Sequence, residues 1–370
     1  MTLAINGRFL TQSVTGVQRF AAEIVTALAA LHATGEAPRP RLLAPPGAPV
    51  TFAGLTVEIT GSRTGQAWEQ LDLPRAAGAG PLLNLGNTAP LRGTRRAVVI
   101  HDAGAFDTPE SYTLAFRSWY RALHLTLPRT GARIVTVSEF SRARLAARLR
   151  LDPVSIAVVP EGGEHVLRSA ADAGVLDRHG LTPNGYALAV GTRAAHKGLG
   201  ALRGAADVLA ARGMVLAIAG ATNAGVFGTD SAPTGDAVRP LGRVTDAELR
   251  ALYENAFCLL FPSRYEGFGL PPLEAMWCGC PIIAARAGAV PEVCGEAALW
   301  FETNPPPPPH LRGRAEVGGR EDQPTSDLPT TLTTLLGSPP LRDHLRSAGA
   351  ERARRYTWPA AARALLQVTT

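Results

Sequence analysis

The 370-residue chain lacks the sequence features of membrane-spanning, secreted and zinc-binding proteins. No apolar run reaches the roughly 20 residues that a bilayer-spanning helix needs. The first eight residues lack the pattern of a signal peptide, so we expect a cytoplasmic protein. The cysteines lack the paired spacing of a zinc cluster and are expected to be buried thiols. They are Cys258, Cys278, Cys280 and Cys294.

Lysine is also nearly absent. The formal net charge is +6, yet Lys197 is the only lysine, so arginine supplies the rest of the basic side chains. A lysine is a compact point charge on a flexible stem, which suits it to binding a pyrophosphate. The sequence around Lys197 is therefore a candidate anion site.

The composition that is present is typical of a soluble globular protein, with 46% hydrophobic and 18% charged residues, and the length is enough for two domains. Short apolar runs alternate with helical patterns, which predicts an α/β fold with parallel sheets and helices on both faces. We predict strands at 3–5, 42–44, 57–59, 82–85, 97–100, 134–137, 156–159, 186–190, 215–219, 257–261 and 281–284. We predict helices at 16–31, 341–354 and 358–366.

The polar, glycine-containing stretch 168–185 is predicted to link two domains. We place an N-terminal domain at 1–170, a C-terminal domain at 171–354 and a terminal helix at 355–370. Residues 302–328 contain a proline run followed by a polar, glycine-rich sequence, and they are expected to form a mobile loop. A proline-rich recognition motif is the alternative for that segment.

Residues 261–281 are the most informative stretch of the chain. An apolar run of strand type leads into a glycine-rich turn and then into a helix that begins near Pro271 and Pro272. Glu266 and Glu274 lie on either side of this turn. Carboxylates accept hydrogen bonds from hydroxyl groups, and free N–H groups at a helix start bind phosphate. The pattern indicates a ligand that has both hydroxyl and phosphate groups, such as a sugar nucleotide. The alternative is a surface loop with two solvated glutamates.

This stretch resembles the signature of the retaining glycosyltransferases of family 4, in which two glutamates stand eight positions apart. The resemblance implies the GT-B fold, with two facing Rossmann-like, doubly wound domains and a central cleft. It places Glu266 beside the donor sugar and Glu274 on the ribose hydroxyls of the nucleotide. It also implies an N-terminal domain that binds the acceptor and a terminal helix that returns to that domain.

Residues 190–198 resemble the pyrophosphate loop of the same family, with Lys197 at the lysine position. Thr192 and His196 stand where many members have arginine, and Arg193 is shifted by one position. Lys197 and Arg193 are therefore expected to bind the diphosphate. A solvated surface cation is the alternative for Arg193.

The resemblance assigns further donor-site positions on both domains. His101 is expected to contact the transferred sugar, and its alternative is a structural histidine. Gly16 is expected to let the backbone approach the donor phosphate, or else simply to start a helix. Glu161 stands where many members have asparagine, and its role is open. The remaining expected donor-binding residues are Thr192, Val244, Gly267, Phe268, Gly269 and Leu270.

The resemblance implies transfer of a hexose from a nucleoside diphosphate sugar, with retention at the anomeric carbon by front-side displacement. The chain has no Asp-x-Asp pair, so we expect no metal and no other cofactor. The subfamily pattern favours mannose from GDP-mannose and a polyprenyl-diphosphate-linked glycan acceptor, in bacterial cell-surface polysaccharide assembly. A sugar-nucleotide epimerase and a non-catalytic sugar-nucleotide-binding subunit remain the alternatives.

Basic and aromatic residues share the predicted helical segments at 110–129 and 142–150. Such faces suit peripheral contact with the inner face of an anionic membrane, and they equally suit solvated helices with a core stripe. No nucleic-acid-binding motif accompanies the charge, so nucleic acid is not an expected partner. Ser138, which follows a predicted strand, is expected to cap the next helix.

Overall fold

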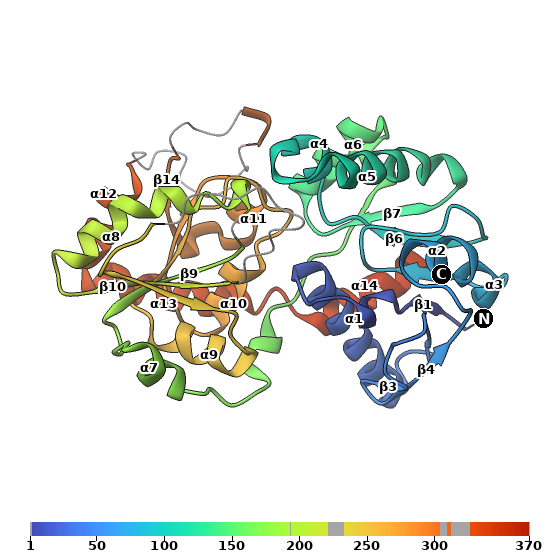
Figure 1. Ribbon diagram of the computed structural model, residues 1–370, viewed down its shortest axis with the longest axis horizontal. Helices are drawn as coiled ribbons and strands as arrows, with labels where there is room; N and C mark the ends of the chain where they lie inside the picture. Colours follow the sequence, from blue (N-terminus) through green and yellow to red (C-terminus); the bar gives the residue numbers. More distant parts are fainter. Residues whose placement is uncertain (1, 193, 221–232, 304–308, 312–325, 370) are drawn as a thin grey trace. The chain divides into compact units, whose positions relative to one another are not determined.

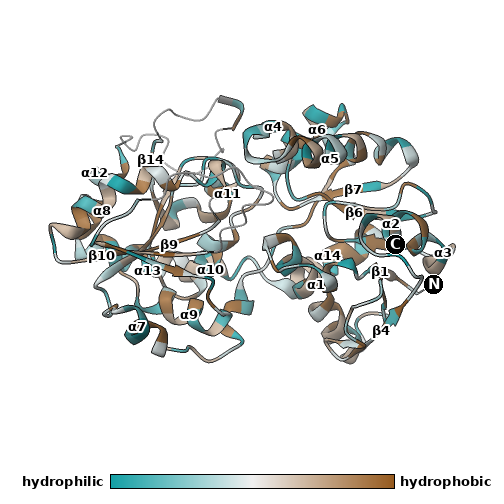
Figure 2. Ribbon diagram, viewed as in Figure 1, coloured by the Kyte–Doolittle hydropathy of each residue, from teal (hydrophilic) through white to brown (hydrophobic). Residues whose placement is uncertain are grey.

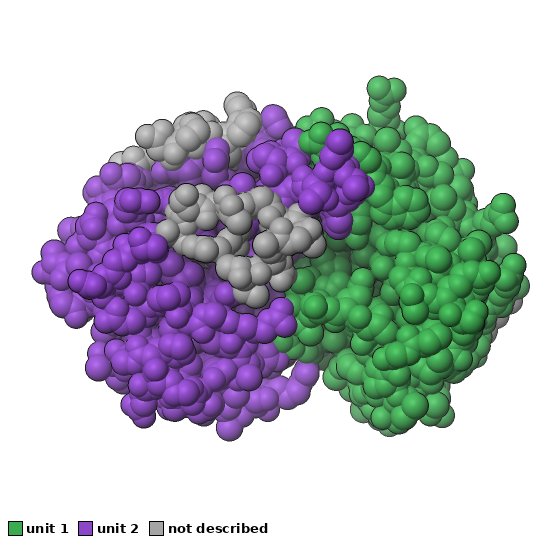
Figure 3. All heavy atoms as spheres, viewed as in Figure 1, with its two compact units in different colours: residues 1–106, 117–162, 357–370 green, residues 107–116, 163–356 purple. Residues whose placement is uncertain are grey.

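The computed structural model describes residues 2–192, 194–220, 233–303, 309–311 and 326–369. The chain forms two compact units, coloured separately in Figure 3. Unit 1 comprises residues 1–106, 117–162 and 357–370, and unit 2 comprises residues 107–116 and 163–356. The units thus divide after residues 162 and 356, whereas the sequence-based limits are 170 and 354, and unit 2 also takes in ten residues from the first half of the chain.

Unit 1 is built on a sheet whose described strands have the order β3-β4-β2-β1-β5-β6-β7-β8 (Figure 1). Strand β3 is antiparallel to β4, and the other pairs are parallel. The strands are β1 (Ala4–Asn6), β2 (Arg41–Ala44), β3 (Thr51–Phe52), β4 (Leu55–Ile59), β5 (Leu82–Asn84), β6 (Arg96–Val99), β7 (Arg133–Thr136) and β8 (Ala157–Val158). The sheet order reverses direction between β1 and β5.

Helix α14 (Trp358–Thr369) belongs to unit 1, where it packs along α1 (Gly16–Ala33). The rings of Phe20 and Trp358 meet edge to face at 5.8 Å, and Arg363 pairs with Glu36 at 2.8 Å. The other α-helices in this half of the chain are α2 (Gly65–Leu71), α3 (Leu73–Ala77), α4 (Gly104–Asp107), α5 (Leu114–Thr126) and α6 (Glu139–Leu149). Ser138 caps α6, because its hydroxyl accepts from the Ser141 N–H at 3.0 Å, as predicted.

Unit 2 is built on a parallel sheet with the order β11-β10-β9-β12-β13-β14. Numbered along the chain within this unit, the order is 3-2-1-4-5-6, which is that of dinucleotide-binding folds. The strands are β9 (Tyr186–Val190), β10 (Val215–Ala219), β11 (Val238–Gly242), β12 (Cys258–Phe261), β13 (Ile282–Ala285) and β14 (Ala298–Phe301). The α-helices are α7 (Gly174–His179), α8 (Leu202–Ala210), α9 (Asp246–Asn255), α10 (Leu270–Trp277), α11 (Val290–Cys294), α12 (Leu328–Leu336) and α13 (Pro339–Ala353).

The core of each unit follows from its central strands, which are largely buried on both faces and therefore read as continuous apolar runs. In unit 2 every residue of β12 and β13 is buried. Figure 2 shows the hydrophobic colouring concentrated on such strands, with polar residues on the outer helices. Three cysteines lie in this core and Cys278 is half-buried, and burial raises the pKa of the Cys258 thiol to about 12. The prediction of buried thiols is thus confirmed for Cys258, Cys280 and Cys294.

The structure also contains elements that the sequence patterns did not indicate. Strand β11 carries Arg239 and Pro240 and lies at an edge of its sheet, where a missing N–H is tolerated. The stretch 168–185, expected to be a linker, instead contains α7, which packs on α9. The loop predicted at 302–328 falls largely outside the residues that the structure describes.

Candidate functional site

The candidate site in unit 2 lies where the strand order reverses, between β9 and β12. In open α/β sheets, ligands bind outside the carboxyl ends of the strands at such a point. The loop after β9 carries Lys197, and the loop after β12 carries Glu266. The two strands are direct neighbours in the sheet, since Leu188 pairs with Leu259. The topology therefore places both loops at one edge.

Lys197 and Glu266 meet at that edge. The Lys197 ammonium donates to Oε1 of Glu266 at 2.6 Å, and the two side chains are 19% and 12% exposed. Both predicted residues therefore lie in one place, within reach of solvent. An ammonium can bind a phosphate as well as a carboxylate, so this pair combines an anion-binding group with an acceptor for hydroxyl groups.

The conformation of the loop that carries Lys197 requires glycine at position 198. Gly198 has a φ of +64°, and a β-carbon there would lie 2.4 Å from the carbonyl oxygen of Pro262. The backbone of the first loop thus touches the backbone of the second, and a side chain would separate them. Close contact at Gly198 brings the Lys197 turn against the loop that holds Glu266.

His196 adds a neutral group beside this pair. Burial, followed by the neighbouring Lys197 ammonium, lowers the pKa of His196 to about 4. The imidazole is therefore uncharged at neutral pH, and its ring stacks at 6.4 Å from that of Tyr112. The positive charge of the loop is thus carried by Lys197 among the residues that the structure describes there. Arg193, predicted to share this role, lies outside the described residues.

The start of α10 lies next to Glu266 in the sequence. Gly269, at a φ of +109°, is the residue before the helix, and no side chain caps the helix start. Because Pro271 and Pro272 have no N–H, the start of α10 offers an anion the Leu270 N–H and the helix dipole. Leu270 and Gly267 belong to this turn as expected, whereas the Phe268 ring is buried and packs edge to face on Tyr356 at 5.7 Å. Phe268 can therefore contribute its backbone to a ligand, but not its ring.

Glu274 lies on α10 and is 6% exposed. Its Oε1 is 3.0 Å from Nε2 of His165, and its Oε2 accepts from the Tyr253 hydroxyl at 3.0 Å. Sequence reasoning missed both partners. His165 is 109 positions from Glu274 and Tyr253 is 21, and no local motif marks either residue.

His101 lies in unit 1, just after β6, and both of its ring nitrogens already face oxygen atoms. Nδ1 is 3.2 Å from Oε1 of Glu161, and Nε2 is 3.1 Å from the Leu85 carbonyl oxygen. Both residues are 5% exposed. Glu161, the departure from the family pattern, is thus the partner of His101. Contact of His101 with a sugar stays a prediction, and it would require one of these bonds to be exchanged.

The other predicted positions are placed as follows. Gly16 is the first residue of α1, with open space around it and no left-handed backbone, so its close approach to a phosphate stays a prediction. Thr192 lies between β9 and the turn at Lys197, and Val244 lies between β11 and α9. The contact of Thr192 and of Val244 with the donor stays a prediction.

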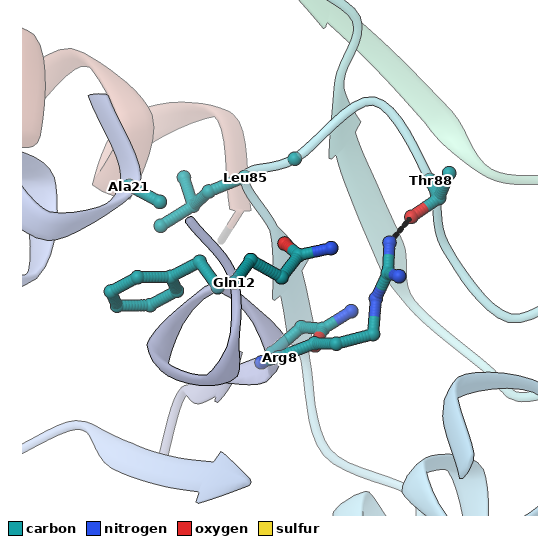
Figure 4. Close-up of a pocket in the computed structure, with 8 residues that line it drawn as sticks. Arg8, Gln12, Ala21, Leu85 and Thr88 are labelled. Atoms are coloured by element: carbon teal, nitrogen blue, oxygen red, sulfur yellow. Dashed lines mark hydrogen bonds between the residues drawn. The ribbon is translucent and has the colours of Figure 1, made fainter. Parts of the chain in front are cut away.

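Unit 1 carries a polar cluster at its own point of reversal, between β1 and β5, which the sequence analysis did not identify. Arg8 pairs with Glu69 at 2.7 Å and donates to the Thr88 hydroxyl at 2.7 Å. Thr88 donates to Glu69 at 2.9 Å, and Asn6 donates to Glu69 at 3.2 Å. Burial raises the pKa of the Glu69 carboxyl. Figure 4 shows Arg8 reaching Thr88 beside Gln12, in a small hollow.

None of the helices in the described part of the chain combines the length and apolar character required to cross a bilayer. Among the same residues, no group of three or more histidine, cysteine, aspartate and glutamate side chains is placed to hold a metal ion.

Comparisons with known proteins agree with this geometry. Residues 185–307 match the family model described as glycosyl transferases group 1. The chain is similar to O-antigen chain mannosyltransferase B of Escherichia coli, with 32% identity over 251 residues, which are 65% of this chain and 64% of that protein. The match thus spans less than two thirds of the relative's length.

Two solved structures share the fold. One is WaaG, a glycosyltransferase involved in lipopolysaccharide biosynthesis, with a TM-score of 0.66, 15% identity, and 100% and 99% of the two chains covered. The other is Alr3699/HepE of Anabaena in complex with UDP and glucose, with a TM-score of 0.67, 14% identity, and 100% and 99% covered. At these identities the likeness shows the fold, and the fold is GT-B, with two parallel-sheet domains of Rossmann type.

Proposed function

Since the chain carries a domain of the glycosyl transferases group 1 family in residues 185–307, we propose that it is a retaining hexosyltransferase that uses a nucleoside diphosphate sugar. The observation that carries the proposal is the meeting of Lys197 and Glu266, at 2.6 Å, at the point where the strand order of unit 2 reverses. A cation for the diphosphate and a carboxylate for sugar hydroxyls are the groups that such a donor requires.

The diphosphate, the transferred sugar and the ribose of the donor each have a residue suited to them. Lys197, the Leu270 N–H and the dipole of α10 would stabilise the diphosphate as it departs, which is where negative charge develops. Glu266 would orient the sugar, and Glu274 would accept hydrogen bonds from the ribose hydroxyls. Lys197 now pairs with Glu266, so a bound diphosphate would compete with that carboxylate for the ammonium.

No protein nucleophile is required if the leaving phosphate deprotonates the acceptor on the same face of the sugar. In that front-side displacement the bond from the anomeric carbon to the phosphate oxygen breaks as the bond to the acceptor oxygen forms. The acceptor proton passes to the phosphate. We propose that this step uses no metal, with Lys197 and the helix start neutralising the leaving group.

Similarity to the Escherichia coli relative supports a particular donor and acceptor. The Escherichia coli relative is an O-antigen chain mannosyltransferase, which supports mannose as the sugar and a cell-surface glycan as the acceptor. GDP-mannose is accordingly the proposed donor, and a polyprenyl-diphosphate-linked glycan is the proposed acceptor. On α5, Leu114 and Trp119 are 67% and 40% exposed, which supports peripheral contact with the cytoplasmic face of a membrane.

A donor panel tests the proposal. The full-length protein is incubated with GDP-mannose, UDP-glucose, UDP-GlcNAc and UDP-glucuronate, with and without EDTA, and melting temperature and donor hydrolysis are measured. We expect one donor to raise the melting temperature, and EDTA to leave that shift unchanged. A shift that EDTA abolishes would contradict metal-free binding, and the absence of any shift would favour a donor outside this set or no transferase activity.

Two further assays separate the alternatives. An epimerase needs no acceptor, so conversion of the sugar nucleotide to its epimer in the absence of acceptor would favour that activity. A non-catalytic subunit would tolerate Glu266→Ala without loss of polysaccharide synthesis in cells. We expect neither result.

A further inference from the structure

The segment that leads from unit 1 into unit 2 is packed tightly on the helix that carries Glu274. A β-carbon on Gly163 would lie 2.6 Å from Cγ of Leu273 and 2.6 Å from Cδ1 of Trp277. Both of those residues belong to α10. The absence of a side chain at Gly163 therefore lets the segment lie directly against α10, two positions before His165.

His165 is held in this place from a second side. Arg250 of α9 donates to the carbonyl oxygens of Leu167 and Ser169, at 2.9 and 2.8 Å. The short turn at Glu164–Leu167 is thus fixed between α9 and α10. His165 is 5% exposed, and its Nε2 lies 3.0 Å from Oε1 of Glu274. Because an ionised carboxylate only accepts, Nε2 carries the proton.

Tyr253 provides the second donor to the same carboxylate. The residue lies on α9, is fully buried, and donates its hydroxyl to Oε2 of Glu274 at 3.0 Å. Burial, followed by the charge of Glu274, raises the pKa of the Tyr253 hydroxyl well above its ordinary value. The phenol therefore keeps its proton and remains a donor throughout the physiological pH range.

Two donors on two oxygens fix the rotation as well as the position of the Glu274 carboxylate. One bond would leave the group free to turn about its last torsion, which is soft for glutamate. Each carboxylate oxygen can accept more than one hydrogen bond, so the carboxylate keeps acceptor capacity for a ligand. A carboxylate fixed in advance loses less side-chain freedom when a ligand binds.

We propose that His165 and Tyr253 are positioning residues that orient Glu274 for a vicinal diol, and thereby give the site its preference for ribonucleotides over deoxyribonucleotides. The inference rests on the proposed function, since it takes the ribose of a nucleoside diphosphate as the group bound by Glu274. It goes beyond that function because it assigns sugar discrimination in the nucleotide to two residues that would not touch the ligand.

Binding of nucleotide pairs to the full-length protein tests this inference. Affinities for GDP and 2′-deoxy-GDP, and for UDP and 2′-deoxy-UDP, are measured by calorimetry. For the base that binds more tightly, we expect the parent to bind the ribonucleotide about tenfold more tightly than its 2′-deoxy analogue. Such a ratio is the loss expected when one hydrogen bond to a charged group is removed. Tyr253→Phe and His165→Ala should reduce that ratio towards one, and so should Glu274→Gln. His165→Gln, which restores an N–H donor, should recover part of the ratio.

Tyr186→Phe is the matched control. Tyr186 is also fully buried in unit 2, and its hydroxyl donates to the Leu252 carbonyl oxygen at 2.7 Å rather than to a carboxylate. Tyr186→Phe should lower the free energy of unfolding, as Tyr253→Phe should, but it should leave the ratio of ribonucleotide to deoxyribonucleotide affinity unchanged. Equal weakening of ribo- and deoxynucleotides in the His165 and Tyr253 variants would overturn this inference alone. Failure of GDP and UDP to bind the parent would overturn it together with the proposed function.

Discussion

The two units present different chemistry at equivalent places in their sheets. In unit 1, Arg8 at the reversal between β1 and β5 is neutralised by Glu69, which is fully buried. In unit 2, Lys197 at the reversal between β9 and β12 pairs with a Glu266 side chain that keeps 12% exposure. The first cluster is satisfied within the protein, whereas the second can exchange a partner for a ligand. The buried Arg8–Glu69 pair is therefore expected to stabilise the fold, whereas the partly exposed Lys197–Glu266 pair is open to a ligand.

The largest expected effect comes from breaking the closed cluster of unit 1. Glu69→Ala leaves the Arg8 guanidinium buried without its counter-charge, and we expect a loss of about 3–5 kcal/mol in the free energy of unfolding. Urea denaturation measures it.

Glu58→Ala is the control for this variant. Glu58 pairs with Arg41 on the surface of the same unit, with both side chains 38% exposed. Its removal should cost at most about 1 kcal/mol. Equal losses in the two variants would contradict the distinction between a closed buried cluster and an exposed pair.

The next effect is on activity and comes from unit 2. Lys197→Ala should lower kcat by about 100- to 1000-fold, as expected when a group that stabilises developing charge is removed. Stability should change little, because the side chain is partly exposed. Initial rates with the donor found in the panel measure the effect.

Lys197→Arg provides the companion variant, since it keeps the charge but changes its shape. We expect its rate to lie between those of the parent and Lys197→Ala. An Ala variant as active as the parent would mean that Lys197 does not act on the diphosphate.

A smaller effect, on stability in acid, should appear in both units. Burial lowers the pKa of His124 in unit 1 to about 4, and burial with Lys197 lowers that of His196 in unit 2 to about 4, from 6.5 in each case. The unfolded chain then binds more protons than the folded one below pH 6.5, so stability falls as pH decreases from 6.5 towards 4.

Between pH 7 and pH 5 each histidine should contribute about 2 kcal/mol to this fall. Urea denaturation at the two pH values measures it, and His124→Gln should remove one of the two contributions. A pH slope that His124→Gln leaves unchanged would show that the buried ring is not the cause.

The sequence could predict what lies in local motifs. The strands β9 and β10, the helix start at Leu270, and the roles suggested for Lys197 and Glu266 all come from short runs of residues with regular spacing. Even the meeting of Lys197 with Glu266, 69 positions apart, is consistent with the carboxyl ends of adjacent parallel strands.

The supporting contacts could not be predicted in this way. Glu161 is 60 positions from His101, and Arg8 reaches Thr88 across 80 positions. Their pairing depends on strand order, which apolar periodicity does not encode. The departure from asparagine at Glu161 was visible in the sequence, but only the packing of unit 1 gives it a partner.

The most direct test of the account uses the fact that Lys197 is the only lysine. An amine-reactive ester modifies this side chain and the N-terminus, and mass spectrometry follows modification of the peptide that contains Lys197. We predict that GDP-mannose, or the donor found in the panel, slows its modification, that the nucleoside diphosphate does so too, and that the nucleoside without phosphates does not. Equal rates of modification with and without a bound donor would contradict the claim that Lys197 binds the diphosphate.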